Sequence, residues 1–581
     1  MKNREKALKI LLAVAVVVVL LQLFLIQIVQ HNSWVKKAED EHIVQSTIKA
    51  RRGEIYLMDG EEPTIAVMNE TVWTLVIDPM LADAEATEKY LAPLIKDTKV
   101  AEFKDVFADK TRRYYVLARR IKRDDAAKIR DKVKEEVLAG VYLKEGNARV
   151  YPEGQLASSL LGFVNIEGEG QYGVEGALDK ELAGENGVLK TITDVNNIAL
   201  SIGDENVRVP AKDGKNVVLS IDRNVQYKME QFLKEQMDSS HAEHAAGLVM
   251  NPRNGEIWAL ANLPSYDAAN YNKVEDATVF INEPLETAYE PGSMCKTFSF
   301  SAAIDQGKMT PSSTYNNNGY LMVDDWKIEN AYKGQLGTIT MQTGLDYSLN
   351  TSSMTALMWL GGDPNQITQA GKNKLYEYYH DKFGFGEYTG IELFEAPGVI
   401  TEPDAADAYN SRYANMTFGQ GMQITMMQLA AAFSSVINGG DFYRPTIVAG
   451  EVTKDGEFKY GEFPEVIRQT VSVETSETMR QMLYGTRSYK RANGTDPEGY
   501  YIGGKTGTSQ GIKDGAYTFD ETVGNYIGFG GAEGELPEYV IMVKIWGEGK
   551  KMEGEKDAMP IFDKMNKYMI DYLKIKPKGA N

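Results

Sequence analysis

The hydrophobic and polar positions of this chain form three patterns, and each pattern predicts a different kind of structure. Residues 10–29 are apolar apart from two glutamines, which is long enough for a helix that crosses a bilayer. Between about residue 33 and about residue 215, apolar and charged stretches alternate and predict a mixed α/β region. Near residue 214 the pattern changes, and strands and amphipathic helices follow to the end of the chain.

The beginning of this last region predicts a strand, a capped helix and a hairpin. Residues 217–221 predict a strand, and Asp222 can then accept hydrogen bonds from the free N–H groups of a helix's first turn. Residues 246–250 and 256–260 predict two strands, because a turn sequence joins them. The helix after Asp222 places these apolar residues on one face: Val225, Met229, Phe232, Leu233 and Met237.

The end of the chain predicts further strands and one last helix. The strands are expected at residues 500–508, 525–529 and 539–546, and Pro560 suits the first position of the helix. Its residues Ile561, Met565, Tyr568, Met569 and Tyr572 recur at helical spacing and are expected in the core. Helices that flank one mostly antiparallel sheet form an α+β fold, and we expect no further domain after them.

The N-terminal apolar run is interpreted as an uncleaved membrane anchor. Four cations precede it against the single acid Glu5, which predicts a cytoplasmic tail at residues 1–9 and a transmembrane helix at residues 10–30. A cleaved signal peptide is the alternative, but residues 30–34 lack a small-x-small cleavage pattern. The rest of the chain is therefore expected outside the cytoplasmic membrane.

Size and charge narrow the classes of function. The 581 residues suffice for two or three domains, and the net charge of −19 makes nucleic acid an improbable partner. Cys295 is the single cysteine, so no internal disulfide can form, and we expect it to be a buried structural thiol. His241 and His244 are the closest histidine pair and have no further ligand cluster near them, so we expect no metal and no cofactor.

One stretch, residues 289–298, carries the strongest chemical signal. Pro291-Gly292 predicts a sharp turn, after which Ser293 begins an apolar helix that runs toward Asp305. Ser293 and Lys296 are three residues apart and share one helix face. A neutral lysine can take the proton of a serine hydroxyl and make it a nucleophile. Burial, nearby positive charge and the positive helix N-terminus would all favour the neutral amine.

Two later motifs strengthen this interpretation. Ser348-Leu349-Asn350 is a Ser-x-Asn triplet, and Lys505-Thr506-Gly507-Thr508 follows it. The Ser-x-Asn triplet alone also fits a cap or a turn, and a second Ser-x-x-Lys at residues 46–49 is interpreted as coincidental. In this order the three motifs are the signature of penicillin-binding proteins and serine β-lactamases. The chain resembles a class B penicillin-binding protein, a membrane-anchored peptidoglycan D,D-transpeptidase.

The resemblance covers nearly the whole chain and implies its domain organisation. Residues 51–56 are similar to the element that opens the family's pedestal, although residues 56–60 depart from the usual continuation. Residues 151–164 and 173–176 also resemble pedestal motifs. We therefore expect a pedestal or dimerisation-like domain at residues 31–215. A transpeptidase domain similar to serine β-lactamases, with a mostly antiparallel sheet flanked by helices, is expected at residues 216–581.

The resemblance also implies roles for the motif residues. Ser293 would be the nucleophile and Lys296 its base, while Ser348 passes a proton to the leaving amine. Asn350 would hold the substrate amide and the Lys296 amine.

The strand motif would bind substrate. Lys505 adds positive charge and attracts a carboxylate, which the hydroxyls of Thr506 and Thr508 would bind. The N–H groups of Ser293 and Thr508 would form an oxyanion hole, and Gly507 would let the strand approach the substrate.

Two other segments are interpreted as structural. Residues 418–421, with Thr425 and Gln428, resemble a family segment near the site and are expected to support it. The charge-rich residues 124–137 predict a solvated helix. In this family the pedestal docks partner proteins, so contact with a partner is the alternative there.

The implied reaction cross-links peptidoglycan stem peptides, with release of D-alanine and with covalent inhibition by β-lactams at Ser293. A β-lactam hydrolase would need a residue to activate water, and no Glu-x-x-x-Asn segment suits that task. A D,D-carboxypeptidase differs only in using water as acceptor and stays open. A β-lactam sensor would need a larger signalling part, and a scaffold would take no penicillin. A multi-span glycosyltransferase is the expected partner, and a division or an elongation role is left open.

Overall fold

In the computed structural model, residues 2–31, 33–34, 43–135, 137–192, 207–461, 465–490, 496–513 and 516–579 are described. They divide into two compact units. The N-terminal unit comprises Met1–Gly53 and Ala183–Gly214, and the main unit comprises Glu54–Leu182 and Lys215–Asn581.

The N-terminal unit contains the apolar helix and a small sheet. Helix α1 (Lys2–Phe24) continues into η1 (Leu25–Val29), and residues Arg4–Val29 are long and apolar enough to cross a membrane. The sheet has the order β1-β8-β9, with β1 (Ile43–Ile48), β8 (Gly187–Ile192) and β9 (Val207–Val209) antiparallel. Ser46 lies in strand β1, so the second Ser-x-x-Lys lacks the helical geometry of the first.

One sheet of the main unit joins the residues expected in the pedestal to the C-terminal region. Its order is β19-β18-β10-β2-β3-β4, and β5 pairs with β3. The predicted strand at residues 217–221 is β10, which is parallel to β2 and antiparallel to β18. The other bounds are β2 (Ile55–Asp59), β3 (Glu62–Ile77), β4 (Tyr115–Ile121), β5 (Val141–Val150), β18 (Val448–Val452) and β19 (Phe458–Tyr460), with β10 spanning Asn216–Asp222.

The helix expected to be solvated is exposed along most of its length and packs through one narrow apolar stripe. Helix α5 (Arg123–Lys134) buries Ala126 and Ile129 in a hydrophobic cluster with α3 (Ala84–Leu91), α4 (Phe103–Ala108) and the faces of β3 and β4. The charged residues of this helix are solvated as predicted, and two apolar residues three positions apart form the narrow stripe that packs. The predicted range extended to residue 137, and residue 136 lies outside the described residues.

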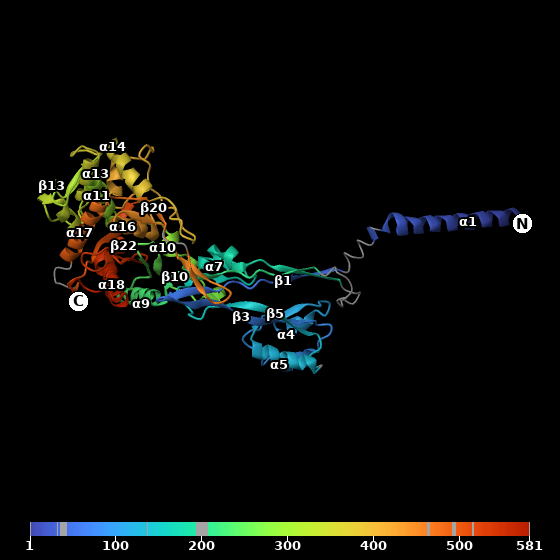
Figure 1. Ribbon diagram of the computed structural model, residues 1–581. Helices are drawn as coiled ribbons and strands as arrows, with labels where there is room; N and C mark the ends of the chain where they lie inside the picture. The colour runs from blue at the N-terminus through green and yellow to red at the C-terminus, as the bar shows by residue number, and fades with distance from the viewer. Residues whose placement is uncertain are drawn as a thin grey trace. The chain divides into compact units, whose positions relative to one another are not determined.

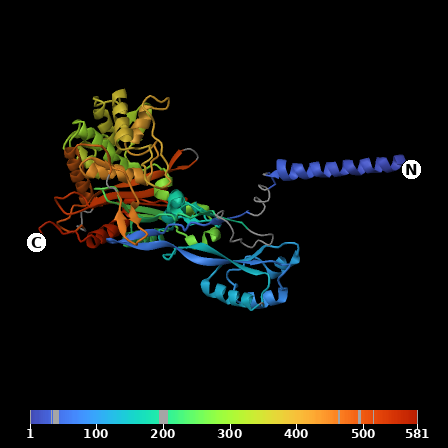
Figure 2. The same ribbon diagram turned by 45° about the vertical axis from the view of Figure 1, so that its right-hand side comes forward.

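The second sheet of the main unit has five antiparallel strands in the order β12-β11-β23-β22-β21. Strand β22 is labelled in Figure 1, and Figure 2 shows the same ribbon turned by 45°. Successive strand residues face opposite sides, so Ala245 and Val249 of β11 belong to one buried cluster with α9 and α18. Ala246 and Leu248 belong to another with α11 (Lys296–Asp305) and α16 (Met426–Ile437). The bounds are β11 (His244–Met250), β12 (Ile257–Leu263), β21 (Gly503–Lys513), β22 (Ala516–Gly530), β23 (Tyr539–Trp546), α9 (Arg223–Ser240) and α18 (Met559–Tyr572).

The prediction of an α+β fold is confirmed, and several predicted limits of strands and helices lie close to the observed ones. Strand β23 has the predicted limits, and Pro560 lies in the first turn of α18. The strands predicted at residues 500–508 and 525–529 are longer, because β21 and β22 continue as a hairpin through polar residues. Backbone pairing holds this extension, and the apolar pattern does not mark it.

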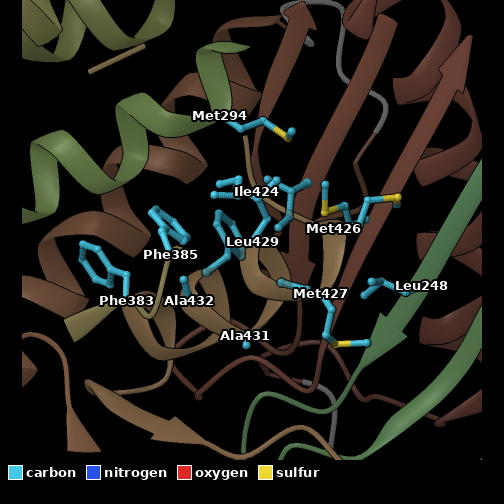
Figure 3. Close-up of a cluster of buried hydrophobic side chains, with 14 of the residues drawn as sticks. Leu248, Met294, Phe383, Phe385, Ile424, Met426, Met427, Leu429, Ala431 and Ala432 are labelled. Carbon is cyan, nitrogen blue, oxygen red and sulfur yellow. The ribbon is translucent and has the colours of Figure 1, made fainter. Parts of the chain in front are cut away.

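The second face of the five-stranded sheet carries the helices that hold the candidate site. Helix α11 (Lys296–Asp305) follows the 3₁₀ turn η4 (Gly292–Cys295), and α16 (Met426–Ile437) is buried along its whole length. Met294 belongs to the same buried cluster as Ile424 and Leu429 (Figure 3). Other helices here are α10 (Glu283–Glu286), α12 (Met341–Asp346), α13 (Asn350–Leu360), α14 (Gln369–Tyr376), α15 (Asn410–Met416) and α17 (Val473–Lys490).

Asp222 caps α9, as expected, and also joins distant segments. Its carboxylate accepts hydrogen bonds from the N–H groups of Asn224 (2.8 Å) and Val225 (3.0 Å) and from the hydroxyl of Tyr572 (2.7 Å). We expect Asp222→Ala to lower the free energy of unfolding by about 1–3 kcal/mol, since it removes a cap and leaves buried donors unpaired. Urea unfolding of the purified protein measures this.

Asp238→Ala, at an exposed position of the same helix, is the matched control. Its carboxylate makes only a 3.7 Å surface pair with Lys234, so the change should cost less than about 0.5 kcal/mol. Equal losses in the two variants would contradict the cap assignment.

Candidate active site

The turn before Ser293 is held in a conformation that favours glycine. Gly292 has φ of +64°, and a Cβ there would lie 2.9 Å from the carbonyl oxygen of Thr508. Residues Gly292–Cys295 form a 3₁₀ turn before the α-helix begins at Lys296. The predicted turn and helix are therefore present, and the first turn is tighter than an α-helix.

The Lys296 side chain is fully buried. Its amine contacts Ser293 of its own motif and both polar residues of the Ser-x-Asn triplet. Its Nζ lies 2.9 Å from Ser293 Oγ and 2.9 Å from Asn350 Oδ1. Nζ also lies 2.6 Å from the Ser348 carbonyl oxygen and 3.3 Å from Ser348 Oγ. The Phe418 ring covers another side, with its centroid 5.9 Å from Nζ.

The pKa of Lys296 lies well below its usual value. Burial is the larger cause, because removal from water disfavours the ammonium form, and the positive charge of Lys505 adds to it. Cys295 opposes the shift. The neutral amine is therefore the favoured form over a pH range where an exposed lysine would be charged.

Ser348 and Asn350 are positioned by the start of α13. Ser348 has φ of +55°, a conformation that few residues other than glycine adopt, and Asn350 is the first residue of the helix. Asn350 Nδ2 donates to the Glu329 carbonyl oxygen at 2.9 Å. This bond fixes the amide so that its oxygen faces Lys296.

Lys505 connects the strand motif to the other two. It is buried on β21, and its Nζ donates to Ser348 Oγ at 2.9 Å and to the Thr506 carbonyl oxygen at 3.1 Å. Hydrogen bonds thus run from Ser293 through Lys296 and Ser348 to Lys505. The structure brings all three predicted motifs together.

The remaining strand residues differ in position. Thr508 faces the cleft and its Oγ accepts a hydrogen bond from the Gly554 N–H, while Thr506 Oγ lies 3.4 Å from Lys505 Nζ. A Cβ at Gly507 would lie 2.7 Å from the Pro291 carbonyl oxygen. The glycine therefore lets β21 pack against the turn before Ser293, which is a different reason from the predicted approach to substrate.

A cleft of about 620 Å³ opens at Ser293. Its walls include residues that the sequence did not mark, from the hairpin of β14 (Tyr320–Val323) and β15 (Trp326–Glu329) and from the β21–β22 hairpin. The Asp324-Asp325 pair between two short alternating runs was the available signal for the first hairpin. The lining residues are Gly292, Ser293, Trp326, Lys327, Ile328, Glu329, Asn330, Ala331, Lys333, Asn350, Ser411, Asn415, Phe418, Gln420, Thr508, Gln510 and Tyr517.

The segment at residues 418–421 supports the site, and it also forms part of the wall. Gly419 has φ of +80°, and its carbonyl oxygen accepts a hydrogen bond from the Gly292 N–H at 3.2 Å. Thr425 and Gln428 form a reciprocal cap at the start of α16. Phe418 and Gln420 line the cleft itself.

The other residues with reactive side chains lie in structural settings. The Cys295 thiol is buried, and burial raises its pKa. His241 ends α9 in a left-handed conformation, and His244 stacks on Trp546. Among the described residues, no group of three or more histidine, cysteine or acidic side chains could hold a metal ion.

The chain is similar to known proteins over both of its expected domains. Residues 245–567 match the penicillin binding protein transpeptidase domain, and residues 47–219 match the penicillin-binding protein dimerisation domain. Stage V sporulation protein D of Bacillus subtilis (strain 168) is 30% identical over 560 residues, which cover 95% of this chain and 83% of that protein.

One further relative and one solved structure are also similar to this chain. A protein named probable peptidoglycan D,D-transpeptidase PenA, from Neisseria meningitidis serogroup A, is 25% identical over 90% of this chain and 84% of its own length. The crystal structure of penicillin binding protein 2X from Streptococcus thermophilus has the same fold, with a TM-score of 0.71 at 22% identity over 91% of this chain and 80% of that one. The order of the two matched domains, together with these relatives, means that this chain belongs to the class B penicillin-binding proteins.

Proposed function

We propose that this protein is a peptidoglycan D,D-transpeptidase that acts through an acyl-enzyme on Ser293. The observation that carries the proposal is the buried Lys296 amine, 2.9 Å from Ser293 Oγ and joined through Ser348 to Lys505. Relatives named as D,D-transpeptidases support the reaction class.

The hydrogen-bond geometry fits a neutral Lys296. A neutral amine has two N–H donors and one lone pair. Asn350 Oδ1 and the Ser348 carbonyl oxygen can accept the two N–H groups, which leaves the lone pair for the Ser293 hydroxyl. Ser293 Oγ then attacks the carbonyl of the penultimate D-alanine, and its proton moves to Lys296 Nζ.

The leaving group needs a proton, and Ser348 can deliver it. Ser348 Oγ lies 3.3 Å from Lys296 Nζ and 2.9 Å from Lys505 Nζ. The proton that Lys296 accepted passes through Ser348 to the amine nitrogen as the C–N bond breaks and D-alanine departs. An amine of a second stem peptide then attacks the acyl carbon, loses its proton by the reverse route and frees Ser293.

The strand motif supplies the binding groups in this proposal. The Lys505 ammonium attracts the terminal carboxylate, and the Thr506 and Thr508 hydroxyls bind it. Backbone N–H groups of Ser293 and Thr508, which line the same cleft, stabilise the oxyanion. A β-lactam enters the same step and stays attached to Ser293.

The proposal includes the arrangement of the chain in the membrane. Residues 1–9 form a cytoplasmic tail, residues 10–30 a single-pass anchor, residues 31–215 the pedestal and residues 216–581 the transpeptidase domain. The apolar helix at Arg4–Val29 and the cations at its N-terminal end support this orientation. A multi-span glycosyltransferase in the membrane is the proposed partner, as the resemblance to class B penicillin-binding proteins implies.

Labelling with a fluorescent penicillin tests the nucleophile. In membranes that contain the full chain, wild type should give one labelled band, and Ser293→Ala should give none because the acylated oxygen is missing. Ser411→Ala is the matched control, since Ser411 lines the same cleft without a role in the reaction. A labelled Ser293→Ala band would contradict the assignment.

The fate of the label separates the related functions. A label that persists for hours fits a transpeptidase, and rapid release indicates a β-lactam hydrolase. A folded wild type without label points to a scaffold, or to a cleft that rejects the drug. A thioester substrate with a D-alanine-like leaving group decides between those two, and products formed with an added amine or with water alone separate transpeptidase from carboxypeptidase.

The pH dependence of acylation tests the role of Lys505. Its positive charge lowers the pKa of Lys296, so Lys505→Met should raise that pKa. Lys296 must be neutral to act, and the acid limb of the acylation rate should therefore move to higher pH in the variant. Stopped-flow acylation from acid to alkaline pH measures the limb.

Lys333→Met is the control for this measurement, because it removes an equal charge from the rim of the same cleft, where Lys333 pairs with Glu329. Its acid limb should stay in place. A limb that does not move in Lys505→Met, or one that moves equally in both variants, would contradict the electrostatic role.

A further inference from the structure

Glu290, three residues before Ser293, holds together two segments that form the wall of the cleft. Its Oε1 accepts a hydrogen bond from the Gly421 N–H at 2.8 Å and another from the Tyr517 hydroxyl at 2.8 Å. Gly421 follows the cleft residues Phe418 and Gln420, and Tyr517 is itself a cleft residue on β22. One carboxylate oxygen thus joins the 418–421 segment and the β21–β22 hairpin to the turn that carries the nucleophile.

The backbone around Glu290 is fixed by the same neighbours. The Ser509 hydroxyl of β21 donates to the Glu290 carbonyl oxygen. The Gly292 N–H donates to the Gly419 carbonyl oxygen at 3.2 Å, and a Cβ at Gly419 would lie 2.3 Å from the carbonyl oxygen of Gly292. The turn therefore has no room to shift independently of these segments.

Burying the Glu290 carboxyl group at this position costs free energy. Its second oxygen, Oε2, is buried and has no hydrogen-bond partner among the described residues. Burying an acid with one oxygen unsatisfied is unfavourable, and an amide or apolar side chain would fill such a place at lower cost. Violations of this kind are expected at functional positions more than in the ordinary core.

We infer that Glu290 is a positioning residue for the acylation of Ser293, holding the nucleophile turn against the 418–421 segment and keeping Tyr517 in place as the cleft wall. The inference rests on the proposed function, because it concerns the same reaction. Glu290 acts through its neighbours, and no contact of its own with substrate is required.

The charge state of Glu290 should matter for this role. Burial raises the pKa of its carboxyl group, while the hydrogen bonds from Gly421 and Tyr517 and the charge of Arg412 lower it. Arg412 is also paired with Asp407, and the Cys295 thiol lies near enough for Glu290 to raise its pKa. An ionised carboxylate is the better acceptor for both donors. Protonation as pH falls through the raised pKa should therefore loosen the turn.

Acylation rates of the full-length protein with a fluorescent penicillin test the inference. We expect Glu290→Gln to slow acylation about 10-fold and Glu290→Ala about 100-fold at neutral pH, since small misplacements of reacting groups have effects of this size. Glu275→Gln, at an exposed position of the same unit, should leave the rate unchanged.

The pH profile separates positioning from a general loss of stability. Wild type and Glu290→Gln should converge as pH falls, because the protonated acid resembles the amide. A rate ratio that is constant with pH, or no difference in rate, overturns the inference. If the Glu290 variants do not fold, Tyr517→Phe removes one of the two bonds, and wild-type rates at every pH in that variant would overturn it as well.

Failure of the proposed function would give a different result from failure of the Glu290 inference. In that case wild type takes no label, as Ser293→Ala does, and 3-fluorotyrosine at position 517 provides the readout. Its ¹⁹F resonance should titrate with Glu290 in the wild-type background and stay fixed in Glu290→Gln. A resonance with the same pH dependence in both backgrounds would overturn the proposed contact.

Discussion

The burial of one amine, Lys296 Nζ, is the constraint on which the rest of the site depends. The proposed acylation of Ser293 requires Lys296 to be neutral, and only a water-poor site lowers the lysine pKa far enough. Such a site lacks the water that would accept hydrogen bonds from the amine. The Ser348 carbonyl oxygen and Asn350 Oδ1 accept them instead. Lys505 adds a second charge at close range, which favours the neutral amine further. The three motifs thus serve a single electrostatic requirement.

Close backbone packing makes this arrangement rigid. Side chains at Gly419 and Gly507 would collide with Gly292 and Pro291, the two residues before the nucleophile. A side chain at Gly554 would in turn lie 2.3 Å from the carbonyl oxygen of Gly507. Successive layers of backbone therefore stack across the site with no side chains between them. Because backbone atoms make these contacts, no change of side-chain rotamer can alter them and shift Ser293.

The cleft is assembled from segments that lie far apart in the chain. The β14–β15 hairpin, the β21–β22 hairpin and the 418–421 segment contribute walls. The Gln420 side chain donates to Gln510 Oε1 at 2.7 Å and so joins the 418–421 segment to β21. Glu290 ties the same walls to the catalytic turn. The walls of the cleft and the turn that carries Ser293 are thus parts of one hydrogen-bonded unit.

The sequence by itself determined the local features of this protein. The Ser293–Lys296 pair shares a face because any helix places residues three apart together, Asp222 caps α9 through its own first turn, and β23 follows from an apolar run that Lys544 alone interrupts. Tertiary structure decided what depends on partners distant in the chain. The burial of Lys296, the polar extension of β21 past Thr508 and the contacts of Glu290 with Tyr517 have no local signature. Periodicity records which residues prefer to be buried, and it contains no information on which segments then meet across the core.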